Sequence, residues 1–313
     1  MTQATPLFDY HIGWKSKGKH PGRHKSNQRG MGIEFAGHTT LLSYPDPRRI
    51  DIRQSIRDPL GEIHVKIFNQ RSATPVMIVC DLSASMNFGG KNKKINLAAE
   101  VAQSIAHSVI DRHDALGLVG FDDEIREDWL APISFRSQHA MTLIHELKKF
   151  TSTNKSNRAI KDLYQYMPRE RALIFFISDF HIPEVELENC LSNLMRHHVV
   201  PIVLWDKKEY INLPNFGIVT ITDPESGKKD TLFLRKELKE KIVDSFEKRR
   251  VAITKAFMNF DIPPFFVDEH FDANKMTEYF NQFVGALGYE ISYFLLDAFT
   301  VNLKFCARCS RMA

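Results

Sequence analysis

The sequence is short of three features: cysteine pairs, long apolar runs and a large excess of charge. Four cysteines in 313 residues are too few for the disulfide framework of a small secreted protein. Residues 1–30 contain no apolar segment of the kind that a signal peptide needs. We therefore expect a cytoplasmic protein whose cysteines are reduced.

The most apolar stretch near the C-terminus does not have the pattern of a membrane span. Residues 283–305 are rich in aromatic and aliphatic side chains, but Glu290, Asp297 and Lys304 interrupt them. A transmembrane helix needs about 20 consecutive apolar residues, so we expect no membrane span. The single Cys-x-x-Cys pair that follows has no second pair and no nearby histidine, and it does not indicate a zinc site.

Charge is distributed unevenly along the chain. The formal net charge of +4 excludes a chain-wide polyelectrolyte, but residues 14–30 hold six Lys or Arg residues and no Asp or Glu. Such a segment could bind phosphate backbones or an acidic protein surface. Trp14 is the only Trp, Tyr or Phe available there for stacking on a base. Nucleic acid is therefore an alternative and not the expected partner.

Changes in composition predict five consecutive parts of the chain. They are a basic flexible arm, an accessory region of short alternating strands, an α/β core, a helical part that packs on the core, and a tail. Their predicted bounds are 1–29, 30–74, 75–225, 226–290 and 291–313.

The core shows apolar strands that alternate with amphipathic helices. Continuous apolar runs, typical of strands buried on both faces of a parallel sheet, occur at residues 76–80, 115–121, 171–179 and 199–205, with a fifth candidate at 217–223. Helical spacing of apolar residues separates them, at 95–114, 138–150, 157–167 and 184–198, and continues at 235–260 and 274–288. This alternation predicts a doubly wound, mostly parallel α/β sheet.

Oxygen ligands gather at the predicted strand ends. The first strand ends in Asp81, followed by Ser83 and Ser85, and the third ends in Asp179. Ligands of doubly wound folds bind at the carboxyl ends of the strands. The hydroxyl-rich loop at 150–163 could add Thr153. Two carboxylates and three hydroxyls suit Mg²⁺ or Mn²⁺, with coordination positions left over.

Helix capping is the simpler explanation for an aspartate and two serines after a strand. The next helix, however, is expected to begin near Lys94, about ten residues later. Capping therefore explains these side chains less well than a metal site does.

The same residues carry a resemblance to a known family. Asp-x-Ser-x-Ser after an apolar strand, a threonine loop and a later Ser-Asp pair resemble the metal-ion-dependent adhesion site of von Willebrand factor A domains. Four further segments occur in the order seen in the von Willebrand A-like proteins associated with MoxR-type AAA+ ATPases: "GRHKSNQRGMGIEF", "RRIDIRQSIR", "DLSASMNFGG" and "ISDF". The resemblance covers residues 22–283. It implies a Rossmann-like core of the von Willebrand A type with a small β-rich accessory layer at its N-terminal side.

By this resemblance the metal shell would consist of Asp81, Ser83, Ser85, Thr153 and Asp179. The threonine loop departs from the Gly-Thr-Asp run usual in the family, so Thr151, Asn154 and Ser156 remain alternatives to Thr153. In such sites a carboxylate of a partner protein fills the open metal position.

The resemblance implies a non-enzymatic, metal-dependent adaptor. It would work with a MoxR-type AAA+ ATPase in maturing or assembling a client complex, for example a metalloenzyme such as methanol dehydrogenase.

The alternative from a different class is a Mg²⁺-dependent phosphohydrolase with Asp81 as nucleophile. Such enzymes usually carry a second carboxylate where this chain has Ser83, and the sequence places no lysine near the site.

Overall fold

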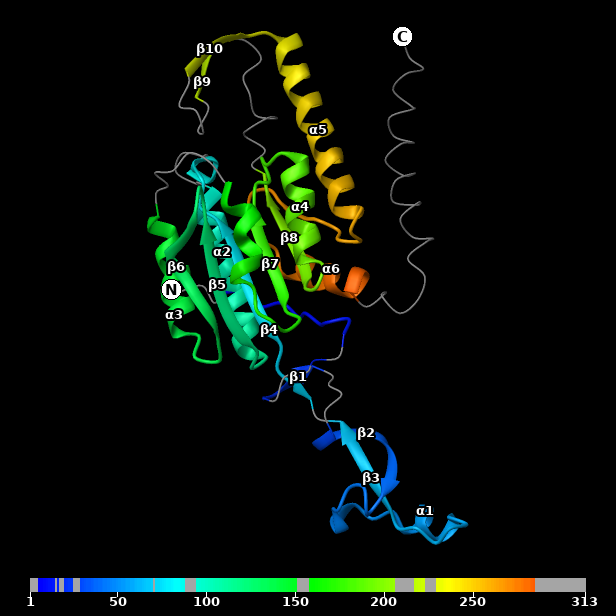
Figure 1. Ribbon diagram of the computed structural model, residues 1–313. Coiled ribbons are helices and arrows are strands. Elements are labelled where there is room, and N and C mark those ends of the chain that lie inside the picture. The colour runs from blue at the N-terminus through cyan, green and yellow to red at the C-terminus, as the bar shows by residue number, and fades with distance from the viewer. Residues whose placement is uncertain are drawn as a thin grey trace, which may run out of the picture.

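The structure is a computed structural model, shown in Figure 1, that describes residues 5–14, 16, 20–24, 29–69, 71–87, 94–150, 158–205, 217–222 and 229–284. A six-stranded sheet forms its centre, with the strand order β11-β8-β7-β4-β5-β6. The strands are β4 (Pro75–Asp81), β5 (Ala115–Phe121), β6 (Ile125–Ser134), β7 (Leu173–Ser178), β8 (His198–Leu204) and β11 (Phe265–Val267). All neighbours are parallel except β5 and β6. The predicted doubly wound, mostly parallel sheet is confirmed.

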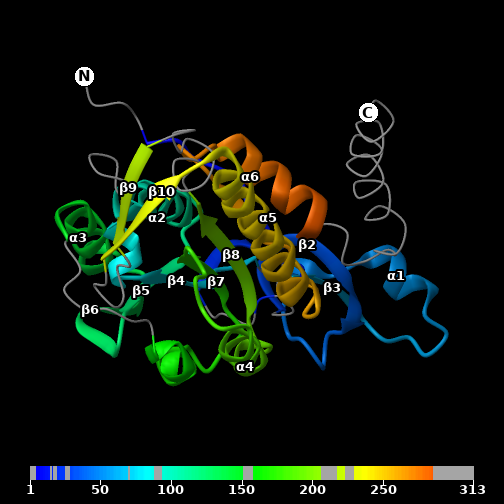
Figure 2. The same cartoon turned by 90° about the horizontal axis from the view of Figure 1, so that it is seen from above.

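Helices cover both faces of this sheet (Figure 2). Alternate residues of a strand point to opposite faces, and β4 divides its side chains accordingly between two apolar cores. Val76 and Ile78 pack with α2 (Lys94–Asp111), α3 (Gln138–Glu146) and α6 (Ala273–Tyr279). Met77 and Val79 pack with the 3₁₀ helix at Arg158–Tyr166, with α4 (Glu184–Leu194) and with the end of α5 (Lys236–Met258). The helix expected near Lys94 begins there.

Two strands of the sheet were not expected from the sequence. Strand β6 carries three charged residues and a proline among its ten residues, so it has no apolar run. It is an antiparallel edge strand that buries only Trp129 and Ala131. Strand β11 has three residues, too few to show a period. The strand expected at 217–223 exists as β9 (Gly217–Thr222), but it pairs with β10 (Lys229–Leu234) in a separate antiparallel hairpin.

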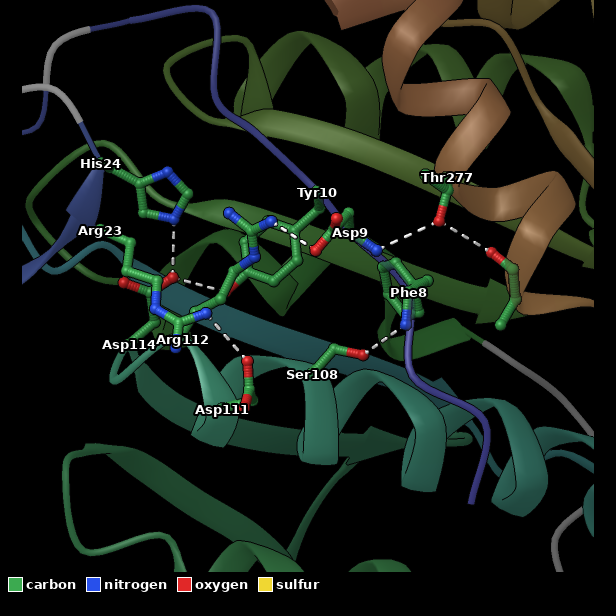
Figure 3. Close-up of polar contacts among 11 residues, drawn as sticks. Phe8, Asp9, Tyr10, Arg23, His24, Ser108, Asp111, Arg112, Asp114 and Thr277 are labelled. Atoms are coloured by element: carbon green, nitrogen blue, oxygen red, sulfur yellow. Dashed lines mark hydrogen bonds and ion pairs between the residues drawn. The ribbon is translucent and has the colours of Figure 1, made fainter. Parts of the chain in front are cut away.

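The N-terminal residues correct the prediction of a flexible arm. Phe8 and Tyr10 are buried and pack against Phe175 and Phe280 of the central core. Figure 3 shows the segment lying along α2, where Ser108 accepts a hydrogen bond from the Phe8 amide. The composition of the segment is polar and basic, but the burial of two aromatic side chains, Phe8 and Tyr10, is enough to fix it to the core. For residues 5–14 and 20–24, the prediction of a flexible arm is therefore wrong.

The accessory region is a hairpin that projects from the sheet (Figure 1). Strands β2 (Arg29–Thr40) and β3 (His64–Asn69) pair antiparallel, and the connection between them contains a 3₁₀ turn (Pro47–Arg49) and α1 (Ile52–Arg57). A short strand β1 (Pro21–His24) lies near the base. This hairpin is the expected β-rich accessory layer. None of the helices in the described residues is both long enough and apolar enough to cross a bilayer.

Candidate metal centre

The parallel pairing of β4 and β7 brings their two terminal aspartates to one edge of the sheet. Cys80 of β4 lies opposite Ile177 of β7, so Asp81 is level with Ser178, and Asp179 is the next residue. Both carboxylates are fully buried, as are Ser83 and, nearly so, Ser85. Four of the five predicted ligands are thus gathered at the carboxyl ends of the strands.

Hydrogen bonds fix the orientation of Asp81. Its Oδ1 accepts the Ser83 amide at 2.9 Å, and its Oδ2 accepts the Ser178 hydroxyl at 2.7 Å. The Ser83 and Ser85 hydroxyl oxygens lie 3.1 Å apart, and Ser85 also hydrogen-bonds Asp179. The alternating serines therefore turn both hydroxyls toward the two carboxylates, as the motif predicted.

Asp179 is oriented by an unusual turn of the chain. Phe180 has φ 51°, in the left-handed region that non-glycine residues rarely adopt. Its amide hydrogen-bonds the Ser178 hydroxyl at 2.9 Å, while the Trp205 indole donates to the Asp179 carbonyl at 2.8 Å. Arg249 holds the same turn by donating to the Phe180 carbonyl at 3.0 Å. Strain of this kind is usually kept where it positions a functional group.

A lysine that sequence reasoning missed lies inside the cluster. The Lys94 ammonium is 2.9 Å from Asp179 Oδ2, and the two side chains are 3% and 0% exposed. Lys94 is the first residue of α2. Polar residues are common at the start of a helix, so the sequence did not indicate that this side chain points into the protein. The expectation that no lysine lies near the site is wrong.

The two carboxylates have opposite electrostatic settings. Burial and the neighbouring charge of Asp179 raise the pKa of Asp81 to about 6. Burial acts to raise the pKa of Asp179, but the charges of Lys94 and His181, together with hydrogen bonds from Lys94 and Ser85, outweigh it and hold this pKa at about 2. Asp179 is therefore the stable anion, with Lys94 as its counter-ion, whereas Asp81 has no ion-pair partner among the described residues.

The donor set fits a hard divalent cation. Adjacent ligands of an octahedral Mg²⁺, each at about 2.1 Å, lie about 3 Å apart, which matches the spacing of the two serine hydroxyls. Among the described residues, no group of three or more His, Cys, Asp or Glu side chains could hold a metal. The donors that the cluster offers are two carboxylates and two hydroxyls. The position of Lys94 is the one feature that opposes such an ion.

The remaining predicted ligand lies outside the described residues. Thr153 and its alternatives Thr151, Asn154 and Ser156 fall in 151–157, so their place in the site stays a prediction. A third buried acid, Asp122, follows β5 at the same edge, but Arg126 lies 3.5 Å from its carboxylate. We do not include Asp122 in the site, because Arg126 already balances its charge.

Comparison with known proteins gives one family match. Residues 45–252 match a family described as "Protein of unknown function DUF58". An "Uncharacterized protein in moxR 3'region" of Paracoccus denitrificans is 26% identical over 98 residues, which are 31% of this chain and 93% of that protein.

Two solved structures illustrate the structural similarities. BatB from Bacteroides thetaiotaomicron has a TM-score of 0.42 at 14% identity, over 69% of this chain and 99% of that one. The SpRpn10 VWA domain has a TM-score of 0.36 at 12% identity, over 67% of this chain and 95% of that one.

Proposed function

Since the chain belongs to the DUF58 family, we propose that it is a non-catalytic adaptor that binds a partner protein through a divalent cation. The observation that carries the proposal is the buried cluster of two carboxylates and two hydroxyls at the ends of β4 and β7. Asp81, Ser83, Ser85 and Asp179 would hold Mg²⁺ or Mn²⁺, with Thr153 as the predicted fifth ligand. A bound ion would supply a positive centre with a position open to a carboxylate oxygen of the partner.

Lys94 would act as an exchangeable counter-ion in this site. Its ammonium neutralises Asp179 at 2.9 Å, which a buried carboxylate requires in the absence of another cation. For Asp179 to become a metal ligand, Lys94 must release it. Because Lys94 is the first residue of α2, its release from Asp179 would change the start of that helix. Metal binding would thereby alter the surface around the site, where we propose that the partner binds.

The partner we propose is a MoxR-type AAA+ ATPase together with a client protein that offers a carboxylate. The relative from P. denitrificans supports this pairing, because its name places it in the 3′ region of moxR. The adaptor would serve in maturing or assembling the client, for example a metalloenzyme. We further propose that it works in the cytoplasm.

The test is capture of partners by the tagged full chain from source lysate, in excess Mg²⁺ and in EDTA, read by mass spectrometry. We expect a MoxR-type ATPase or a client to be retained only with Mg²⁺, and to be lost with Asp81→Asn. The matched control is Glu184→Gln, an exposed carboxyl at the start of α4, which should capture as the wild type does. Identical captures in both buffers would contradict metal-dependent docking.

One observation favours the phosphohydrolase as a second candidate. Lys94 lies beside the two strand-end carboxylates, where phosphatases of that type use a lysine. Against it, Asp81 is fully buried, whereas a nucleophile must be reached by its substrate. Turnover of p-nitrophenyl phosphate that is lost in Asp81→Asn would favour the enzyme over the adaptor.

A further inference from the structure

The tip of the accessory hairpin, residues 41–63 between β2 and β3, exposes an unusual number of large apolar side chains. Five of them are between 47% and 92% exposed, namely Leu42, Ile52, Ile56, Leu60 and Ile63. Single exposed apolar residues are common, but a group within one connection marks an interaction site. The tip lies at the end of the molecule opposite the carboxyl ends of β4 and β7 (Figure 1).

Polar contacts, not apolar ones, hold α1 in place at this tip. Asp51 caps the helix by accepting from the Arg53 and Gln54 amides, and the Ser55 hydroxyl accepts from the His64 amide at 2.8 Å. No residue of α1 is buried. Ile52 and Ile56, four residues apart, share one helix face and are 68% and 78% exposed. A helix normally docks through its apolar face, so here that face is left for another molecule.

The charges around these isoleucines are arranged to attract acid. Residues 41–63 contain four arginines and four acidic residues, so their net charge is zero. The acids are largely engaged within the hairpin: Asp46 pairs with Arg49, Asp51 with Lys66 and Asp58 with His64. Three arginines, in contrast, have no acidic partner within the described ranges: Arg48, Arg53 and Arg57.

We propose that the hairpin tip binds an acidic, amphipathic segment of a partner protein. Its apolar face would cover Ile52 and Ile56, and its carboxylates would pair with Arg53 and Arg57. A net charge of zero gives little attraction to an anionic bilayer, which depends on an excess of Lys and Arg. A second copy bound through the same tip would oppose arginine to arginine. A protein segment with patterned charges satisfies both constraints.

The probe is a pair of labelled amphipathic helical peptides of equal length, one with Glu and one with Lys on its polar flanks. Fluorescence anisotropy with the full chain in EDTA keeps the result independent of the metal site. We expect the Glu peptide to bind at least about tenfold more tightly than the Lys peptide. Arg53→Glu with Arg57→Glu should reverse that preference, and Ile52→Ser with Ile56→Ser should weaken binding about tenfold.

Two controls separate this proposal from other occupants. Val185→Ser removes an equally exposed apolar side chain (69%) from α4 and should leave peptide binding unchanged. Equal affinity for the two peptides would overturn the proposal. So would co-sedimentation of the chain with phosphatidylserine vesicles, or self-association in analytical centrifugation, if either were abolished by Ile52→Ser with Ile56→Ser.

Discussion

Two buried aspartate clusters lie at opposite ends of the same sheet, and they differ in how their charges are balanced. At the amino end, Asp114 accepts the Thr74 amide at 2.8 Å, His24 Nε2 at 2.7 Å and the Tyr10 hydroxyl. Tyr10 lies 104 residues from Asp114 in the sequence, and Figure 3 shows Tyr10 and His24 beside Asp114. At the carboxyl end, Lys94 pairs with Asp179, and no ion pair to Asp81 is formed by the residues that the structure describes.

The difference separates a structural site from a binding site. Three donors from separate segments of the chain, namely the Tyr10 hydroxyl, His24 and the Thr74 amide, meet on Asp114, so the cluster joins the N-terminal segment to the sheet. Within the described part of the chain, two carboxylates here have one ion-paired lysine, and burial raises the pKa of Asp81. A further cation would relieve the unfavourable energy of this arrangement. Burial of an acid alone therefore indicates neither role; the set of donors around it does.

The largest effect should come from breaking the amino-end cluster. Asp114→Ala leaves the Tyr10 hydroxyl, His24 and the Thr74 amide without their shared acceptor. Removing one member of a buried charged network costs about 3–5 kcal/mol. Urea unfolding should show this loss with and without Mg²⁺. A loss below about 1 kcal/mol would mean that the N-terminal segment does not depend on Asp114.

Lys94→Met should give a loss of stability that Mg²⁺ repairs. In EDTA the buried Asp179 charge loses its counter-ion, which we expect to cost about 3 kcal/mol. In Mg²⁺ that cost should disappear, and the affinity for Mg²⁺ should exceed that of the wild type because no ammonium competes for Asp179. Lys148→Met, at an exposed position, is the control. Equal destabilisation in both buffers would show that Lys94 is only structural.

Asp81→Asn should keep or raise stability while it removes metal binding. The folded pKa of Asp81, about 6, lies above its ordinary value of 3.8. Its contribution to stability is therefore complete below pH 3.8 and is lost as the pH rises through 6. Asparagine does not titrate, so in EDTA the variant should match the wild type near pH 4. It should exceed the wild type at pH 8 by at most about 3 kcal/mol.

Thermal unfolding across this pH range, combined with Mg²⁺ titration, tests that expectation. If the variant were less stable than the wild type at pH 8 in EDTA, Asp81 would be a structural acid like Asp114. The proposed difference in role between the two ends of the sheet would then be contradicted.

The smallest effect should come from Tyr10→Phe. The hydroxyl is one of three donors to Asp114, and the ring keeps its contacts with Phe175 and Phe280. Loss of one hydrogen bond to a charged acceptor costs about 1.5–3 kcal/mol, and the two remaining donors should hold the loss near the lower figure. Urea unfolding measures it. A loss equal to that of Asp114→Ala would show that the Tyr10 hydroxyl alone attaches the N-terminal segment to Asp114.

The sequence predicted one of these clusters and not the other. Asp81, Ser83 and Ser85 lie within five residues of one another, and Asp179 follows a clear apolar strand. The prediction that both strands end at one edge of a parallel sheet was therefore enough to place the four residues together. Tyr10, His24 and Asp114 are distant in sequence, and only Asp114 ends a segment with a clear period, so no local pattern joined the three. Lys94 was not predicted either, because the direction of its side chain depends on how α2 packs against the sheet. Strands β6 and β11 were missed because one is charged and the other too short.

The most direct measurement is calorimetric titration of Mg²⁺ into the wild-type chain and into Ser83→Ala with Ser85→Ala. Both serines lie within the cluster, and neither hydroxyl takes part in the Asp114 network. The account predicts one Mg²⁺ per wild-type chain, and binding at least about tenfold weaker in the double variant. Equal binding by both chains, or no binding by the wild type, would contradict a metal centre at the ends of β4 and β7.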